Sequence, residues 1–285
     1  MRADCGRSIV VIMTSEMQTA PSNRHVVAAL DGSVAGSFVA DWAAARAHAM
    51  GDRLTLVHVV LPVWVFQVPD EHTLALKRAE DLLGSEAGRV HQTYPDLEAA
   101  TTIATGEPAE ALSALSLKAG LMVVGTDRGP GTEGEGFGCV SFQVAVTSRC
   151  PVAVIPHNAP GQSSGVVVGV DGSPDAAGAL ELAAGEARRL NEELIIVHAV
   201  DPHAAGGGPD DVAGKSAEWV NRNFPDISMR ILSDPVHTPA EALTEASRGA
   251  RLLVIGRKGK GGLSVLVGSV AQHILLNLRC PTILS

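Results

Sequence analysis

Short runs rich in Val, Leu and Ile alternate along the chain with longer stretches whose apolar residues recur at helical spacing. Apolar runs at 25–30 and 54–60 flank a helical pattern at 33–50, which predicts a β-α-β unit. The turn at 31–33 reads Asp-Gly-Ser and supplies N-cap chemistry between the first strand and the helix. Strands that alternate with helices in this way indicate a mostly parallel, doubly wound α/β sheet.

The same alternation continues to the end of the chain. In the first half we expect further helices at 71–93, from Pro108 onward and at 140–148, and strands at 99–103, 121–124 and 152–155. In the second half we expect strands at 166–170, 194–200, 227–232, 252–255 and 282–284, and helices at 174–190, 212–223, 239–249 and 268–277. Each half therefore predicts a five-stranded parallel sheet flanked by helices.

The two halves also match each other in sequence, at five places and in the same order. The matching pairs are 27–33 with 167–173, 54–58 with 194–198, 108–112 with 239–243, 122–125 with 253–256, and 149–151 with 279–281. A duplication of this length predicts two copies of one domain. We place them at 25–156 and 165–285, with a linker at 157–164 and a flexible extension at 1–24, in which Met17 is an alternative start.

Composition limits the class of protein. Hydrophobic residues make up 46% of the chain and aromatic residues only 3%, so the core must consist of small and branched aliphatic side chains. A net charge of -9 and a pI near 5.5 argue against a nucleic-acid partner. Since no apolar run approaches the roughly 18 residues of a spanning helix, and residues 9–13 make a poor secretory segment, we expect a cytoplasmic protein without a membrane partner.

The segments that could bind a ligand follow the first and fourth strands of each half. In an open parallel sheet, ligands bind beyond the carboxyl ends of the strands. In the second half, Asp171 follows the first strand, and a glycine-rich loop at 256–268 runs from the fourth strand into a helix. Glycine backbone and a helix N-terminus suit a phosphate chain, whereas the spacing fits neither a Walker A loop nor a dinucleotide GxGxxG motif.

These motifs resemble the tandem universal stress proteins that are frequent in actinobacteria, over roughly residues 25–285. The resemblance implies two Rossmann-like domains of the adenine nucleotide alpha hydrolase-like type, and ATP as ligand, with Mg²⁺ left open. It implies adenine near Ala199 and Val200, ribose on Asp171, phosphates on Gly256, Gly259, Gly268 and Ser269, and Lys258 as a nearby cation. The second loop departs from the ATP-binding pattern: it is one residue short between Gly259 and Gly268, and it has Ala271 where that pattern often has Ser or Thr.

The first half carries a weaker version of this site. Its candidate residues are Asp31, Gly125, Arg128, Gly138, Cys139 and Ser141. Arg128 stands where the second glycine is expected and Cys139 where Ser or Thr is expected, while Ser141 keeps a hydroxyl donor. The loop at 125–138 has one Arg against three acids, net -2, whereas the loop at 256–268 has three basic residues and no acid, net +3. Polyphosphate should therefore prefer the second half.

The other reactive residue types favour structural roles. Cys5, Cys139, Cys150 and Cys280 have no metal or redox spacing; we expect reduced thiols, with Cys150 and Cys280 buried ahead of strands. Cys139 at a helix N-terminus fits a tolerated small residue better than a redox group. His58 and His198 end equivalent strands without a nucleophile partner and are expected to be packed, hydrogen-bonded histidines. Glu133 and Glu135 are expected to be solvated rather than metal-binding.

Three functions remain open from the sequence. The first is a nucleotide-binding regulatory protein in the stress response, with its main site in the C-terminal domain. The second is an enzyme, such as a nucleotidyl transferase or a slow ATPase; no HxGH-like signature or general base is visible, so we expect no catalytic residues. The third is a scaffold that has lost nucleotide and acts on an unidentified protein partner. The family resemblance further implies pairing of the two domains along their fifth strands, and it leaves a homodimer open.

Overall fold

The computed structural model describes residues 24–126, 139–156, 163–199, 211–259 and 266–285. By its contacts the chain divides into two compact units. The first comprises Met1–Asp127 and Ser148–Cys150, and the second comprises Arg128–Thr147 and Pro151–Ser285. This division differs from the sequence repeat, because the last helix and strand of the first copy are grouped with the second copy.

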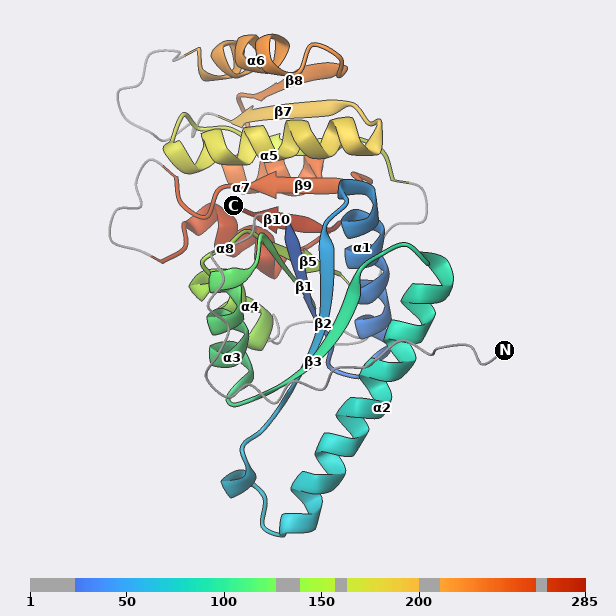
Figure 1. The fold of residues 1–285 in the computed structure, drawn as a ribbon. Coiled ribbons are helices and arrows are strands. Elements are labelled where there is room, and N and C mark those ends of the chain that lie inside the picture. The colour runs from blue at the N-terminus through green and yellow to red at the C-terminus, as the bar shows by residue number, and fades with distance from the viewer. Residues whose placement is uncertain (1–23, 127–138, 157–162, 200–210, 260–265) are drawn as a thin grey trace. The chain divides into compact units, whose positions relative to one another are not determined.

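The first unit is a parallel sheet with helices on both faces. Its elements are β1 (His25–Ala29), α1 (Val34–Met50), β2 (Arg53–Val60), η1 (Val63–Val65), α2 (Pro69–Thr93), β3 (Ala99–Thr105), α3 (Pro108–Leu115), η2 (Ser116–Lys118) and β4 (Leu121–Gly125). The strands lie in the order β3-β2-β1-β4, all parallel. Figure 1 shows α1 and α2 on one face of this sheet and α3 on the other.

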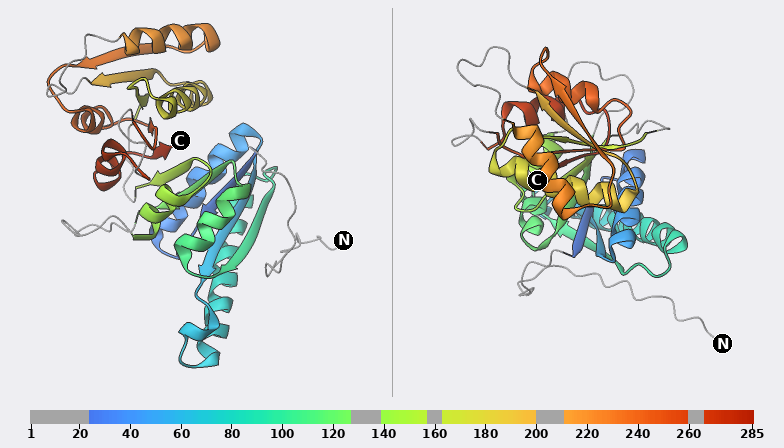
Figure 2. Two further views of the ribbon diagram at one scale, coloured as in Figure 1. Left: turned by 90° about the vertical axis from the view of Figure 1, so that its left-hand side faces the viewer. Right: turned by 90° about the horizontal axis from the view of Figure 1, so that it is seen from above.

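The second unit repeats this arrangement and adds two strands, β5 and β10. Its elements are α4 (Cys139–Thr147), β5 (Val152–Ile155), β6 (Val166–Gly169), α5 (Pro174–Leu190), β7 (Leu194–Ala199), α6 (Val212–Asn223), β8 (Met229–Asp234), α7 (Pro239–Ala246), β9 (Leu252–Ile255), α8 (Ser269–Leu276) and β10 (Thr282–Leu284). The strands lie in the order β5-β10-β9-β6-β7-β8. All are parallel except β5, which runs antiparallel to β10. Helices α5 and α6 pack together on one face, and α7 and α8 on the other (Figures 1 and 2).

The predicted fold class is confirmed, with one difference in the first copy. The second copy forms the expected five-stranded parallel sheet, β10-β9-β6-β7-β8. In the first copy, however, the four strands β3-β2-β1-β4 make the sheet of the first unit, and the fifth strand, β5, lies in the second unit. There it pairs with β10, so the expected contact between the two fifth strands is present. All four residues of β5 are buried, so this pairing removes an apolar edge from water.

Local signals explain why the helices begin and end where they do. The hydroxyl oxygens of Ser33 and Ser173 accept hydrogen bonds from backbone N–H groups in the first turns of α1 and α5. Gly32 and Gly172, just before them, have φ values of +83° and +79°, a conformation that disfavours any residue with a side chain. At the other end, Gly51 and Asn191 adopt the left-handed conformation that terminates α1 and α5.

One strand and one helix of the second copy differ from their predicted bounds. The strand expected at 227–232 spans Met229–Asp234, and it begins late because the Ile227 N–H donates to the Phe224 carbonyl in a turn that closes after α6. The helix expected at 239–249 ends at Ala246, since the chain turns at Ser247 and Gly249 has a φ of +76°. The short 3₁₀ segments η1 and η2 were not predicted. Nowhere in the described ranges is there a helix with both the length and the apolar character to cross a membrane.

Candidate functional site

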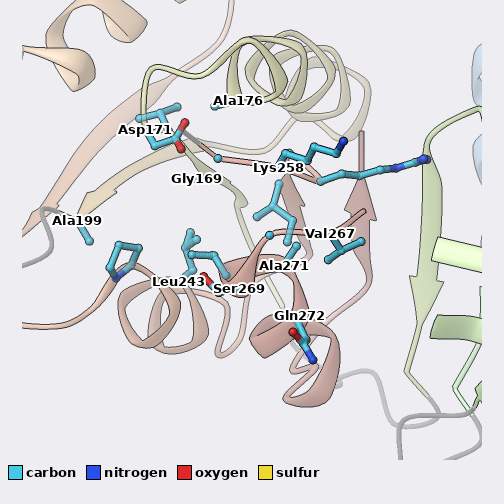
Figure 3. A pocket seen from close by; sticks show the side chains of 18 of the residues that line it. Gly169, Asp171, Ala176, Ala199, Leu243, Lys258, Val267, Ser269, Ala271 and Gln272 are labelled. Carbon is cyan, nitrogen blue, oxygen red and sulfur yellow. The ribbon is translucent and has the colours of Figure 1, made fainter. Parts of the chain in front are cut away.

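A cavity of about 480 Å³ opens in the second unit at the carboxyl ends of β6, β7 and β9. This is where ligands bind in open parallel sheets, because the strand order reverses beside β6. Its walls come from the turn after β6, the end of β7, the first turns of α7 and α8, and the segment that follows β9. In the view of Figure 3, Asp171 and Lys258 lie across the cavity from Leu243 and Ser269.

The structure brings together most of the residues that the sequence singled out. Those lining the cavity are Asp171, Ala199, Gly256, Lys258, Gly259, Gly268 and Ser269. Val200 lies outside the described residues. Nucleotide contact by this set stays a prediction, but residues separated by almost 100 positions in sequence do share one cavity.

Asp171 is held in place by the turn that carries it. Its Oδ1 accepts a hydrogen bond of 2.8 Å from the Ser173 N–H, and its carboxylate is half-buried. The His198 Nδ1 lies 2.8 Å from the Val170 carbonyl oxygen and thus ties the end of β7 to the residue before Asp171. A carboxylate fixed at the mouth of a cavity can accept hydrogen bonds from the hydroxyls of a sugar.

The three loop glycines meet three different neighbours. A Cβ on Gly256 would lie 2.8 Å from the Asp175 Cβ and 2.9 Å from its backbone carbon, so Gly256 packs against the first turn of α5. A Cβ on Gly259 would lie 2.7 Å from the Asp171 Oδ2. Gly268 faces the beginning of its own loop, and its N–H donates to the Arg257 carbonyl at 2.8 Å. The missing side chain of Gly256 thus accommodates helix α5, and contact between Gly256 and a phosphate stays a prediction.

Helix α8 begins at the cavity without a side-chain cap. Its N-cap is Gly268, which has no side chain to bond the first-turn N–H groups. The N-terminus of a helix carries a partial positive charge and attracts anions. Ser269, in the first turn, adds a hydroxyl, and Lys258 on the facing segment adds a cation. This end of the cavity has the donors that a phosphate group requires.

The sequence placed Ala199 at the base end of the cavity but did not predict Leu243 in its apolar wall. Leu243, on α7, lies so close to β6 that a Cβ on Gly169 would be 2.9 Å from its Cδ1. The first copy has Ala29 at the position of Gly169, and this difference in sequence could have indicated the close approach of Leu243. Ala271, buried at 2% exposure, lines the cavity with a methyl group where the first copy has Ser141.

The candidate residues of the first copy are only partly described. Asp31 is exposed, and its Oδ1 accepts hydrogen bonds from the Ser33 N–H at 2.9 Å and the Ser33 hydroxyl at 2.6 Å. Gly125 ends β4, and Ser141 is buried in α4. Arg128 and Gly138 lie outside the described residues, and the side chain of Cys139 is not described. Glu133 and Glu135 lie outside the described residues as well.

The histidine and cysteine predictions are confirmed where the structure describes them. The His58 Nδ1 lies 2.7 Å from the Leu30 carbonyl oxygen, which matches the bond that His198 makes in the second copy. Cys150 and Cys280 are buried, and burial raises the pKa of the Cys280 thiol to about 12. Within the described residues, no three His, Cys, Asp or Glu side chains are arranged to hold a metal ion.

The family comparison matches most of the chain. A model of the universal stress protein family matches residues 22–156, 164–223 and 231–285. The chain is 30% identical to universal stress protein Rv2005c of Mycobacterium tuberculosis, an alignment that covers 93% of this chain and 98% of that protein. It is also 30% identical to universal stress protein Rv2623 of the same organism, over 94% of this chain and 98% of that protein.

Solved structures show the same fold over the same length. A universal stress protein from Archaeoglobus fulgidus superposes with a TM-score of 0.75 at 18% identity, covering 92% of this chain and 98% of that one. A putative universal stress protein from Pseudomonas aeruginosa superposes with a TM-score of 0.64 at 15% identity, covering 92% of each chain. At these identities the likeness extends to the fold alone.

Proposed function

The chain belongs to the universal stress protein family, and on that premise we propose that it is a regulatory protein of the stress response that binds an adenine nucleotide, ATP, in the cavity of its second copy. The observation that carries the proposal is the convergence of an apolar wall, a fixed carboxylate and an anion-attracting helix end in one cavity. These three features suit a base, a ribose and a phosphate chain respectively.

Each feature of the cavity is assigned to one part of the nucleotide. Leu243 and Ala199 supply apolar surface for the base, Asp171 supplies an acceptor for the ribose hydroxyls, and the start of α8 faces the phosphates with Ser269. Lys258 supports the phosphate end by charge. An Mg²⁺ ion would be held mainly by the nucleotide phosphates, in keeping with the lack of a metal-binding cluster among the described side chains.

We propose a binding role without catalysis. The His198 Nδ1 is engaged with the Val170 carbonyl, and this bond ties the end of β7 to the turn that carries Asp171. The first copy is proposed to be mainly a structural partner, since its loop at 125–138 has a net charge of -2 whereas the loop at 256–268 has +3. Incubation of the purified protein with ATP and measurement of released phosphate tests this role, and turnover that is abolished with Asp171→Ala would contradict it.

The binding proposal is tested by calorimetric titration of ATP into the protein and three variants. Asp171→Ala removes the proposed acceptor of the ribose hydroxyls, and Gly268→Asp places a negative charge beside the phosphates. Both variants are expected to weaken ATP binding about tenfold or more. Asp is a favoured N-cap residue, so Gly268→Asp should leave α8 intact while it repels phosphate.

Asp31→Ala is the matched control in the first copy and is expected to change ATP affinity less than twofold. Equal loss from Asp31→Ala and Asp171→Ala would contradict the placement of the site. If the purified protein releases no adenine nucleotide on denaturation and shows no titratable binding of ATP, the scaffold function replaces the proposed one.

A further inference from the structure

The first turn of α5 holds the peptide group of Lys258 from both sides. The Lys258 N–H donates to the Asp175 Oδ2 at 3.0 Å, and the Ser173 hydroxyl donates to the Lys258 carbonyl at 3.4 Å. Asp175 and Lys258 are 83 positions apart in sequence, so this contact joins two distant segments. It fixes the residue that introduces the glycine-rich loop, directly beside the cavity.

Packing reinforces the same contact. Gly256 lies against Asp175 so closely that a Cβ there would also come within 3.1 Å of the Ala176 N. Gly259, just after Lys258, is placed against the Asp171 carboxylate. The segment 256–259 is thus held at its beginning by Asp175 and reaches the proposed ribose acceptor at its end.

The first copy differs from the second at the position of Asp175. Ala35 occupies the position equivalent to Asp175, so no carboxylate is available there. Its Ser33 hydroxyl donates to Asp31, whereas the equivalent Ser173 hydroxyl donates to Lys258. The serine hydroxyl therefore bonds within the turn in the first copy and reaches Lys258 in the second.

From these contacts we propose that Asp175 is a positioning residue that sets the phosphate-binding loop of the second copy. The inference rests on the proposed function for its ligand, but the contact itself can be measured in the ligand-free protein. Asp175 acts through the backbone of Lys258 and touches no ligand. Its carboxylate also lies in the first turn of α5, where the helix dipole stabilises a negative charge.

Two substitutions of Asp175 distinguish the effect of its hydrogen bond to Lys258 from the effect of its negative charge. A carboxamide oxygen accepts the same hydrogen bond from the Lys258 N–H, and it brings no negative charge near a phosphate. Asp175→Asn should therefore preserve the loop and keep ATP affinity within about threefold of the parent or raise it. Asp175→Ala removes the acceptor and is expected to lower ATP affinity about tenfold, the range for loss of one hydrogen bond to a charged group.

The test combines two measurements on the full chain. Amide hydrogen exchange at Lys258, followed by NMR without ligand, should accelerate about tenfold or more in Asp175→Ala and stay near the parent rate in Asp175→Asn. In titrations with ATP, the affinity of Asp175→Asn should likewise stay near that of the parent, and the affinity of Asp175→Ala should be lower. Glu181→Ala, an exposed position on α5, removes an equal charge away from the loop and should change neither measurement.

Unchanged Lys258 exchange in Asp175→Ala overturns the proposal, as does an Asp175→Asn variant that behaves like Asp175→Ala. Thermal unfolding shows that each variant is folded before it is compared. If Lys258 exchange responds as expected while the parent protein binds no ATP, the positioning contact stands and the proposed function fails.

Discussion

Gly256 shows that a glycine of a predicted binding motif can also be required by packing. Its missing side chain accommodates the first turn of α5, whose Asp175 Cβ and backbone carbon lie within 2.9 Å of the position a Cβ would occupy. Backbone atoms cannot move aside as a flexible side-chain end can. The packing of the loop on helix α5 is therefore enough to require glycine at this position.

Replacement of Gly256 by Ala is expected to reduce the free energy of unfolding by about 1–3 kcal/mol, the usual cost of overpacking. It should also weaken ATP binding, because the added methyl group would displace Asp175 and disturb its hydrogen bond with Lys258. Urea denaturation and ATP titration measure the two effects.

Gly178→Ala is the matched control for this substitution. Gly178 lies in α5 with nothing within 4 Å of the position of its Cβ, so Ala should raise stability by about 0.5–1 kcal/mol through its better helix propensity. If Gly256→Ala were as well tolerated as Gly178→Ala, the packing role would be refuted.

At the scale of elements, the connection from β8 to α7 carries a charged pair at the edge of the second unit. The Asp234 Oδ1 accepts hydrogen bonds from the Val236 and His237 N–H groups, and its Oδ2 lies 2.8 Å from the His237 Nδ1. The backbone hydrogen bond from His237 is the largest of the contacts that lower the pKa of Asp234 to about 2. The hydrogen bond to Asp234 raises the pKa of His237 above 6.5, with Glu241 and Glu245 adding in the same direction.

The pair therefore predicts a defined pH dependence. Because the folded pKa of His237 is raised, its stabilising contribution is complete below about pH 6.5 and is lost as the pH rises through the raised value. Because the folded pKa of Asp234 is lowered, its contribution is present above 3.8 and is lost as the pH falls toward 2. His237→Gln should therefore cost more stability at pH 5.5 than at pH 8.5, as measured by urea denaturation at each pH.

An NMR titration of His237 supplies the control. In the parent protein its pKa should exceed 6.5, and Asp234→Asn should return it toward that value. An equal effect of His237→Gln at both pH values would show that the charged pair does not contribute. The His237 side chain is exposed and the Asp234 side chain is partly exposed, so the effect should be small and should decrease with added salt.

At the scale of the whole molecule, the two copies share a strand pairing but differ in their chemistry. Strands β5 and β10 pair antiparallel, with Ile283 opposite Ala153, and every residue of both strands is buried. Ile283→Ala is expected to cost about 2–5 kcal/mol of unfolding free energy, as is usual for a large core side chain.

Ile231→Ala on β8 is the control, since Ile231 is 44% exposed on the outer strand of the same sheet. Its cost should stay below about 1 kcal/mol. Guanidinium denaturation of both variants measures the difference, and similar values would contradict the central place of the β5–β10 pair.

Much of the fold was predictable because its signals are local. Periodicity, N-cap serines and terminating glycines act over a few residues, and they located most helices and strands to within two positions. β8 begins two residues later than predicted because the turn at Ile227 depends on a bond to Phe224 that apolar character does not reveal.

The sequence by itself determined the duplication, the order of strands and helices, and the glycine-rich loop that follows the fourth strand of each copy. Only the tertiary structure decided that Gly256 packs on α5, that Leu243 fills the space beside Gly169, and that Asp175 holds Lys258. The reason is physical. Local conformation depends on neighbours along the chain, whereas these contacts arise between segments more than 70 positions apart, and packing alone brings them together.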